Sequence, residues 1–384
     1  MDDRPLVCID CRYLRERPSG MTPMIQSLVD FLPGWAPDLR FLFLRHPKAT
    51  APLSRAANVT ERVVHLEPNS PSTMWFLPWF VDLRGVALFH ATFNFLPFGL
   101  TMPTVVTIND VMWMTHPEWA RKPGLWGRIE TPFYRIGIRN ALRRATHITT
   151  ISQASWKEIV RLEPAAASRM SISREGVSTE VFHPMSDRAF VDATREKWVP
   201  GAKRFVLTVG QYAGYKNHHT VVRAFGRAFR HEADVHLAMI QRLGKGRVTL
   251  EEIAREEGVH GRVHFPRDVP ERELVALYNG AIALCHPSLV EGFGNCPSEA
   301  LACGCPVVTS NRSSMPEVSA DAGLYVDPES VESVADGLRR VAGDPALAAS
   351  MREKGLRRAR ELTWQAYARG NLDAYRLVLD AVRR

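Results

Sequence analysis

The sequence predicts an α/β protein made of two successive Rossmann-like domains. Short apolar runs alternate with segments of helical periodicity, as in proteins with largely parallel sheets. The alternation occurs in two series, and 384 residues suit two domains better than one. Between the series, residues 183–203 contain His183-Pro184 and Val199-Pro200-Gly201, which break periodicity and predict a hinge.

The first series predicts a domain over residues 1–185. Helical periodicity is clearest at 132–145 and 153–162. Strands are expected at 5–10, 40–44, 62–66, 86–90, 104–108, 147–151 and 170–173.

The second series predicts a domain over residues 186–362, beginning with the strand Phe205-Val206-Leu207-Thr208-Val209. Further strands are expected near 235–240, 262–265, 281–285, 306–309 and 323–326. Helices are expected near 217–230, 249–257, 270–279, 297–303, 330–342 and 345–360. The last segment, 363–384, has the pattern of an amphipathic helix.

Composition is that of an ordinary globular protein, with 45% hydrophobic and 23% charged residues. No stretch approaches the roughly 18–20 apolar residues that a membrane span needs. Met1-Asp2-Asp3-Arg4-Pro5 leads straight into the first strand, so we expect no signal peptide and a cytoplasmic protein.

Six cysteines in a chain of this length do not predict a disulfide framework. Cys8 and Cys11 have C-x-x-C spacing, but the pair lies in a strand without a second pair, which favours buried cysteines over a redox or metal site. The histidines show no zinc spacing. We expect no metal and no cofactor.

Positive charge is concentrated in residues 121–174, which hold eleven Lys/Arg and three Asp/Glu, an excess of 11 − 3 = 8 that equals the net charge of the whole chain. One interpretation of this segment is a solvated helical face. The other is a peripheral contact with anionic lipid or with a pyrophosphate-linked acceptor, and such a contact would hold the protein at the inner face of the cytoplasmic membrane. Nucleic acid is disfavoured because no nucleic-acid-binding motif accompanies the charge.

An aromatic cluster precedes this basic segment and consists of Trp75, Phe76, Trp79 and Phe80. Core packing is the first interpretation of the cluster. A platform that faces a sugar or a lipid is the alternative.

The most informative motif runs from Glu291 to Glu299 and reads Glu-Gly-Phe-Gly-Asn-Cys-Pro-Ser-Glu. It joins an apolar strand to a helix in which Pro297 suits the first turn and Gly304 the end. Glycines let backbone N–H groups approach a ligand, and a helix N-terminus favours phosphate. A carboxylate at each end of such a loop suits neutral hydroxyls. The motif therefore predicts a nucleotide-sugar site.

A second loop supplies a cation. Lys216 follows the strand that ends at Val209-Gly210 and precedes Asn217, the expected N-cap of the next helix. A lysine there would neutralise the diphosphate that leaves during transfer, and a surface lysine is the alternative.

These motifs resemble the family-4 glycosyltransferases of the GT-B fold, whose signature is two Glu separated by seven residues. The segments Val209-Gly210, Lys216-Asn217, Ala302–Val308, Met315–Val318 and Asp321–Pro328 extend the resemblance, as do Val106–Asp110, His116–Trp119 and Thr150–Ser152 in the first half. The resemblance implies two Rossmann-like domains facing a cleft, with the terminal helix crossing back to the N-terminal domain. It covers most of the chain.

The resemblance also implies roles for individual residues. Glu291 would lie beside the donor sugar and Glu299 would hold the ribose hydroxyls. With Lys216, the catalytic set would include Asn109 and Asp110, which end a strand in the first domain. The donor-binding set would comprise Gly20 (following Ser19), Gly210, Gln211, Lys216, Arg242, Arg267, Gly292, Phe293, Gly294, Asn295 and Glu299.

Three positions depart from the pattern of the family. Asn109 stands where His is usual, Gln211 and Tyr215 stand where one Arg is usual, and Gln241-Arg242 replaces a glycine-rich stretch. One cation is thus missing from the leaving-group site, unless Arg242 or Arg267 supplies it.

The function implied is a retaining, metal-independent glycosyltransferase with the donor on the C-terminal domain. The resemblance favours transfer of mannose or a related sugar, with a GDP-sugar preferred over a UDP- or dTDP-sugar. The acceptor would be a saccharide or a polyprenyl-diphosphate-linked sugar of bacterial surface polysaccharide. Two alternatives stay open: a catalytically silent nucleotide-sugar-binding protein of the same fold, and a sugar-nucleotide epimerase.

Overall fold

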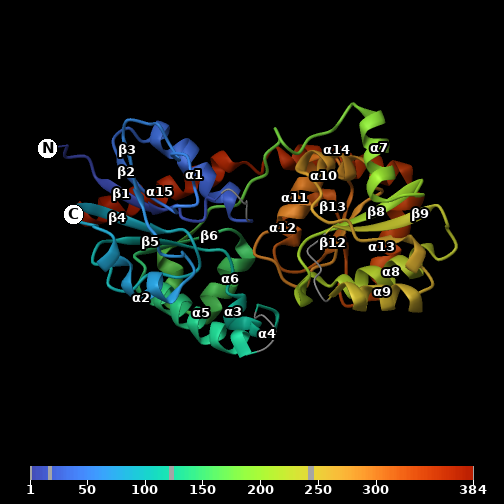
Figure 1. The fold of residues 1–384 in the computed structure, drawn as a ribbon, viewed down its shortest axis with the longest axis horizontal. Coiled ribbons are helices and arrows are strands. Elements are labelled where there is room, and N and C mark those ends of the chain that lie inside the picture. Colours follow the sequence, from blue (N-terminus) through green and yellow to red (C-terminus); the bar gives the residue numbers. More distant parts are fainter. Residues whose placement is uncertain (1, 16–19, 121–124, 241–245, 384) are drawn as a thin grey trace. The chain divides into compact units, whose positions relative to one another are not determined.

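The computed structural model describes residues 2–15, 20–120, 125–240 and 246–383 (Figure 1). The chain forms two compact units. Unit 1 comprises residues 1–176 together with 364–384, and unit 2 comprises residues 177–363. The α/β architecture with two domains that the sequence predicts is confirmed.

Unit 1 is built on a seven-stranded parallel sheet in the order β3-β2-β1-β4-β5-β6-β7. Strand β1 lies inside the sheet, and Val7 pairs with Phe41 of β2 on one side and with Leu88 of β4 on the other. The strands are β1 (Leu6–Asp10), β2 (Arg40–Arg45), β3 (Val59–Val63), β4 (Val86–Ala91), β5 (Thr104–Ile108), β6 (His147–Thr150) and β7 (Met170–Ile172).

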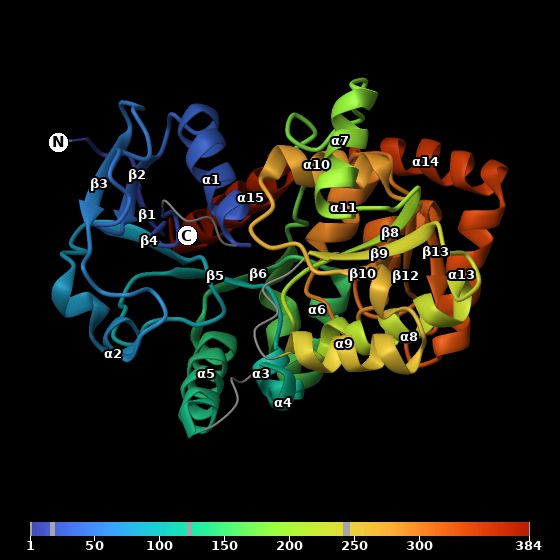
Figure 2. The same cartoon turned by 45° about the vertical axis from the view of Figure 1, so that its right-hand side comes forward.

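Helices cover both faces of this sheet. Figures 1 and 2 show α1 and α15 on one face and α2 and α5 on the other. The helical elements are α1 (Thr22–Trp35), α2 (Pro71–Phe80), α3 (Met112–Thr115), α4 (Pro117–Ala120), α5 (Leu125–Arg144), α6 (Gln153–Leu162), η1 (Pro164–Arg169) and α15 (Trp364–Arg383).

The terminal helix α15 is part of unit 1, as the resemblance implied. It packs against α1, and two buried polar contacts fix it to the sheet. The hydroxyl of Tyr375 lies 2.6 Å from Nδ1 of His90, and Thr149 Oγ1 donates to Asn371 Oδ1 at 3.4 Å. Such contacts satisfy buried polar groups and therefore specify how the helix docks.

Unit 2 is built on a six-stranded parallel sheet in the order β10-β9-β8-β11-β12-β13. Its strands are β8 (Arg204–Val209), β9 (Val235–Ile240), β10 (Val263–His264), β11 (Leu284–His286), β12 (Val307–Ser310) and β13 (Gly323–Val326). Its helical elements are α7 (Arg188–Trp198), η2 (Gly214–Lys216), α8 (His218–Phe229), α9 (Gly246–Glu256), η3 (His260–Arg262), α10 (Glu271–Gly280), α11 (Asn295–Ala302), α12 (Met315–Ser319), η4 (Ala320–Ala322), α13 (Val331–Gly343) and α14 (Pro345–Ala359).

The order of strands explains where a ligand site can form. The chain leaves β8 in one direction across the sheet to β9 and β10, and then returns to β11 on the other side of β8. At such a reversal, the loops after the two neighbouring strands diverge and leave room at the carboxyl edge. The loops after β8 and β11 carry Lys216 and Glu291.

Residues 183–203, where the sequence predicts a hinge, lie within unit 2 and contain α7. Asp187 caps this helix, and its side chain accepts a hydrogen bond from the backbone N–H of Phe190 at 3.0 Å. The Pro and Gly residues that suggested a hinge lie outside the helix at both ends. Strand β3 also lies three residues earlier than expected, since it is an edge strand whose half-exposed residues give no apolar run.

The prediction that the aromatic cluster on α2 packs in the core is wrong. The buried residues of that helix are Thr73, Met74 and Leu77, whereas Trp79 and Phe80 are exposed. Cys8 and Cys11, by contrast, are buried and unpaired as expected.

Candidate active site

Lys216 and Glu291 form a buried ion pair in unit 2. The Nζ of Lys216 lies 2.6 Å from Oε1 of Glu291, and the two side chains are only 13% and 10% exposed. Lys216 ends η2, the short turn that follows β8, while Glu291 follows β11. The two residues that the sequence motifs singled out are thus brought together, although 75 positions separate them in the chain.

A third residue, His286, completes this cluster and was not predicted. It is the last residue of β11, and its Nε2 lies 3.0 Å from Glu291 Oε1 and 3.1 Å from Ser288 Oγ. Because Glu291 can only accept a hydrogen bond when ionised, these partners assign the proton to Nε2. The one sequence feature that could have indicated His286 is its position, since it is a polar residue at the end of an apolar strand and therefore at the carboxyl edge of a parallel sheet.

The cluster fixes the charges of its members. Burial alone would raise the pKa of Glu291, but Lys216 and His286 outweigh it and hold the pKa at about 2. Burial would lower the pKa of Lys216, and Glu291 raises it instead. Burial lowers the pKa of His286, which Glu291 only partly offsets. At neutral pH the cluster is therefore a carboxylate, an ammonium and a neutral imidazole.

The backbone around Lys216 is held by Asn217. This residue has left-handed backbone angles, φ 59° and ψ 35°, which Asn tolerates better than most residues. It precedes α8 as expected of an N-cap, but its side chain makes no capping bond. Instead its Nδ2 donates to the carbonyls of Pro287 at 3.1 Å and Pro328 at 2.6 Å. The loop after β8 is thereby tied to the loops after β11 and β13.

The Glu291–Gly294 loop is held in turn by two serines from the β12–α12 connection. Ser313 Oγ donates to the carbonyl of Glu291 at 2.8 Å, and Ser314 Oγ donates to that of Phe293 at 2.6 Å. Gly294 has φ +121°, a conformation that residues with a side chain rarely adopt. It directly precedes α11, so the glycine loop ends at a helix N-terminus as the motif predicted.

Glu299 lies one helix turn into α11 and meets Tyr278. The Tyr278 hydroxyl donates to Oε2 of Glu299 at 2.9 Å. Burial raises the pKa of Glu299 to about 7, in spite of this hydrogen bond. A carboxylate oxygen accepts hydrogen bonds, so Glu299 is suited to bind hydroxyl groups.

The neighbouring donor candidates line the same loops. Gly210 directly follows β8, has φ +141° and lies against the side chain of Lys216. Gln211 is exposed, and its Nε2 donates to the hydroxyl of Tyr215 at 3.2 Å. Phe293 is buried, while Gly292 and Asn295 lie on either side of Gly294 in the loop.

Arg267 is not brought to the cluster. It is exposed and lines a hollow of about 670 Å³ beside β10, together with Arg247, His260 and Trp198. Ser19 and Arg242 lie outside the described residues.

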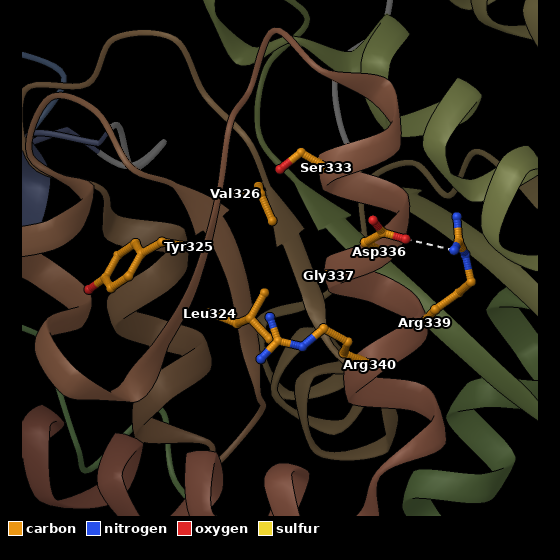
Figure 3. A pocket seen from close by; sticks show the side chains of 8 residues that line it. All are labelled: Leu324, Tyr325, Val326, Ser333, Asp336, Gly337, Arg339 and Arg340. Carbon is orange, nitrogen blue, oxygen red and sulfur yellow. Dashed lines mark hydrogen bonds and ion pairs between the residues drawn. The ribbon is translucent and has the colours of Figure 1, made fainter.

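A separate hollow of about 580 Å³ opens beside the edge strand β13, and Asp336 and Arg339 on α13 form a 2.6 Å ion pair at its rim (Figure 3). Its lining residues are Leu324, Tyr325, Val326, Ser333, Asp336, Gly337, Arg339 and Arg340. None of them belongs to the glycine-loop motif.

Three further candidates, Gly20, Asn109 and Asp110, belong to unit 1. Asn109 follows β5, and its backbone N–H donates to Asn94 Oδ1 at 2.8 Å. Its own Oδ1 is buried and has no hydrogen-bond partner among the described residues. Asp110 Oδ1 accepts from the backbone N–H of Met112 at 2.9 Å, at the start of α3. Gly20 is exposed and precedes α1.

The part of the chain that the structure describes holds no group of three or more metal-ligating side chains. None of its helices is long and apolar enough to cross a membrane.

The two parallel sheets and their covering helices have the fold of GT-B glycosyltransferases. Residues 191–358 match the family model described as "Glycosyl transferases group 1". The recognition made from the sequence motifs is thereby confirmed.

Two curated relatives show the range of similar proteins. O-antigen chain mannosyltransferase B of Escherichia coli is 26% identical over 293 residues, which are 76% of this chain and 74% of the relative. D-inositol 3-phosphate glycosyltransferase of Corynebacterium glutamicum is 28% identical over 246 residues, which are 62% of this chain and 59% of the relative. The chain thus spans less than two thirds of the second relative.

Two solved structures share the fold at low identity. Sucrose-phosphate synthase from Thermosynechococcus elongatus superposes with a TM-score of 0.75 at 18% identity and covers 98% of this chain and 100% of its own. Anabaena HepE, solved with UDP and glucose, superposes with a TM-score of 0.68 at 15% identity, with coverage of 97% and 99%.

Proposed function

We propose that the chain is a retaining, metal-independent hexosyltransferase that uses a nucleotide-diphosphate sugar. Its acceptor would be a saccharide or a polyprenyl-diphosphate-linked sugar in the assembly of a bacterial surface polysaccharide. The observation that carries the proposal is the 2.6 Å contact between Lys216 and Glu291 at the carboxyl edge of a parallel sheet, next to the N-terminus of α11.

The leaving diphosphate would bind between Lys216 and the first turn of α11. Helix N-termini bind phosphate through their unpaired N–H groups and the positive end of the helix dipole. Lys216 would stabilise the negative charge that develops as the sugar departs, which is usually the largest contribution to catalysis of this kind. A positive side chain at this place is what makes a metal ion dispensable.

The two carboxylates would bind the neutral parts of the donor. Glu299 would accept hydrogen bonds from the ribose hydroxyls, and Glu291 would contact the sugar. His286 would hold Glu291 in place through the Nε2–Oε1 contact. The acceptor hydroxyl would attack from the face that the diphosphate leaves, and an oxygen of that phosphate would take its proton. This route needs no side-chain base.

The choice of sugar rests on similarity. The relative with the widest coverage quoted above is named a mannosyltransferase acting on O-antigen chains, which supports mannose and hence a GDP-sugar. The HepE structure contains UDP, so a UDP-sugar is the main competitor.

Binding of nucleotide sugars to the purified protein is the first test. Thermal stability should be measured with GDP-, UDP-, dTDP- and ADP-sugars, with and without EDTA. A ligand at a hundredfold excess over its Kd stabilises by about 2.7 kcal/mol. Stabilisation by one nucleotide class, unchanged by EDTA, supports the proposal, and the absence of any shift contradicts it.

A silent nucleotide-sugar-binding protein is the second candidate. Gln211 and Tyr215, which stand where the family usually has an Arg, bond to each other and contribute no charge. Release of nucleoside diphosphate from the bound donor over a broad acceptor panel would exclude this candidate. An epimerase would instead convert the donor without any acceptor.

The basic segment 121–174 is proposed to hold the enzyme peripherally at the inner face of the cytoplasmic membrane. On α5, the arginines Arg139, Arg143 and Arg144 are exposed, as a contact with anionic lipid requires. A solvated face would have the same exposure, so vesicle binding must decide between the two.

A further inference from the structure

The hollow beside β10 is built from other elements than the Lys216–Glu291 cluster. Strand β10 is the edge of the unit 2 sheet, whereas the cluster follows β8 and β11 inside it. Figure 2 shows α9 on one face of this sheet and α7 on the other. The β10 hollow measures about 670 Å³ and is lined by residues of both helices, of η3 and of the loop after β10. Small-molecule sites have volumes of about 300–1,000 Å³, so the hollow has a suitable size.

The lining of the β10 hollow is positively charged. It contains Arg247, Arg255 and Arg267 against a single carboxylate, Glu251, which gives 3 − 1 = +2 before any charge on its histidines. Arg247 and Glu251 cancel, since they form an ion pair of 2.6 Å. The excess charge therefore belongs to Arg255 and Arg267, and His260 lines the same hollow.

Arg255 is not paired, although acidic residues stand near it on α9. Glu251 precedes it by four residues, the spacing that best suits an ion pair on a helix, yet the carboxylate of Glu251 binds Arg247 instead. Glu256 pairs with Arg223 of α8 at 3.2 Å. Arg255 is thus exposed and has no side-chain hydrogen bond or ion pair within the part of the chain that the structure describes. Its guanidinium remains available to a ligand.

The aromatic side of the hollow is fixed. Trp198 ends α7, and its indole N–H donates to the carboxylate of Glu273, which also binds Lys197 at 2.8 Å. The guanidinium of Arg247 lies over the ring of Phe265, with 5.3 Å between its central carbon and the ring centroid. Aromatic walls that are already held in one position lose little conformational entropy when a ligand binds.

We propose that the β10 hollow is a second ligand site, which binds a small phosphorylated molecule with a planar ring. Arg255 and Arg267 would hold the phosphate, since a guanidinium group donates two parallel hydrogen bonds to such an oxyanion. The ring would pack on Trp198. The net positive charge of the lining favours an anion over a neutral sugar. This inference does not rest on the proposed transfer reaction, because these side chains are not part of the Lys216–Glu291 cluster.

Calorimetric titration of the full chain tests the proposal. The probes are AMP, glucose 6-phosphate, inorganic phosphate and adenosine, at about 100 mM salt to screen unspecific attraction. AMP is chosen because the proposed donors carry guanine or uracil. It should bind with a Kd below about 1 mM, and the two phosphates without a purine should bind more weakly because nothing packs on Trp198. Adenosine should not bind measurably, since it offers the arginines no phosphate.

Substitutions in the hollow locate the bound probe. Arg255→Gln and Arg267→Gln should each weaken AMP binding about tenfold, because each removes a charge-assisted hydrogen bond. Arg188→Gln is the matched control, since Arg188 is exposed at the start of α7 and does not line the hollow. AMP should quench the fluorescence of the wild type more than that of Trp198→Phe, which keeps an aromatic ring.

Titration of Lys216→Met separates the hollow from the donor site. This variant should bind AMP as the wild type does, whatever its affinity for nucleotide sugars. Loss of AMP binding in Lys216→Met would overturn the proposal and place the phosphate at the Lys216–Glu291 cluster. Wild-type affinity in the double variant Arg255→Gln with Arg267→Gln would overturn it as well. A Kd above about 1 mM for every probe would also overturn it, as expected of arginines that are only solvated.

Discussion

Replacement of Lys216 by methionine separates what the buried ion pair does for the fold from what it does for the reaction. Methionine keeps most of the length of the side chain and removes the charge. Glu291 would then remain 10% exposed, with His286 as its remaining partner in the cluster. Removal of one member of a buried pair is costly because it leaves the other charge uncompensated.

The size of the effect follows from the pKa of Glu291. The ordinary value is 4.5 and the folded value is about 2, and the difference, 4.5 − 2 = 2.5, corresponds to about 3 kcal/mol. Because the folded pKa is depressed, this stability is present above the unfolded pKa of 4.5 and is lost as the pH falls through about 2. Burial opposes ionisation, so the depression is the net result of Lys216 and His286 acting together. Because His286 remains beside Glu291, we expect Lys216→Met to remove a large part of this stability at pH 7, up to about 3 kcal/mol.

Calorimetry and single-turnover kinetics measure the two consequences. A loss of about 3 kcal/mol should lower the melting temperature of a unit of this size by about 6–12 °C. Lys216→Met with Glu291→Gln should recover most of that loss, because no unpaired charge remains. Both variants should lose about 10²–10³ in transfer rate, since the stabiliser of the leaving group is absent. A single variant as stable as the wild type, or a double variant no more stable than the single one, would refute the reasoning about the pair.

Three further predictions concern the neighbours of the pair. Burial raises the pKa of Glu299 in the folded protein to about 7, so ionised Glu299 destabilises the fold fully above pH 7 and not at all below pH 4.5. Glu299→Gln should therefore raise the melting temperature at pH 8 but not at pH 4. The same variant should bind the donor more weakly, as measured by calorimetry. His286→Ala should lower the transfer rate about tenfold and His286→Gln should restore part of it, because the glutamine amide can again donate to Glu291; equal rates in the two variants would contradict a positioning role. Gly294→Ala should destabilise the protein by more than about 1 kcal/mol because φ is +121°, whereas Gly343→Ala, where a Cβ meets nothing within 4 Å, should have little effect in the same denaturation assay.

The sequence predicted the second sheet well because strands that are buried on both faces of a parallel sheet have continuous apolar sequences. Its six strands lie within a few residues of the expected positions. The glycine-loop motif was also interpretable, since Pro297 and Gly304 mark the two ends of a short helix that the structure contains. Local signals sufficed where local geometry decided the structure.

Features that depend on tertiary packing were missed. His286 becomes part of the site only because the loops after β8 and β11 converge, and its own neighbours in the sequence give no sign of this. The apolar sequence of α2 predicts burial, yet the sheet covers one side of that helix and leaves Trp79 outside. Helix α7 was hidden because its flanking Pro and Gly residues were given more weight than the cap at Asp187.

The charges of the site show why Lys216 distinguishes an enzyme from a binding protein. Before a ligand arrives, its ammonium is paired with Glu291, and the imidazole of His286 is kept neutral by burial. An incoming diphosphate must therefore share Lys216 with Glu291 and draw its remaining stabilisation from the N–H groups that begin α11. Because ground-state binding leaves this lysine partly engaged, its removal should reduce affinity modestly. The charge that develops on the leaving phosphate has no second cation among the groups described around Glu291, so removal should reduce the rate of a working enzyme far more. If the Lys216 variant lost affinity and rate in equal proportion, the lysine would contribute equally to the bound ground state and to the transition state. That result is expected of a site that holds its ligand without acting on it.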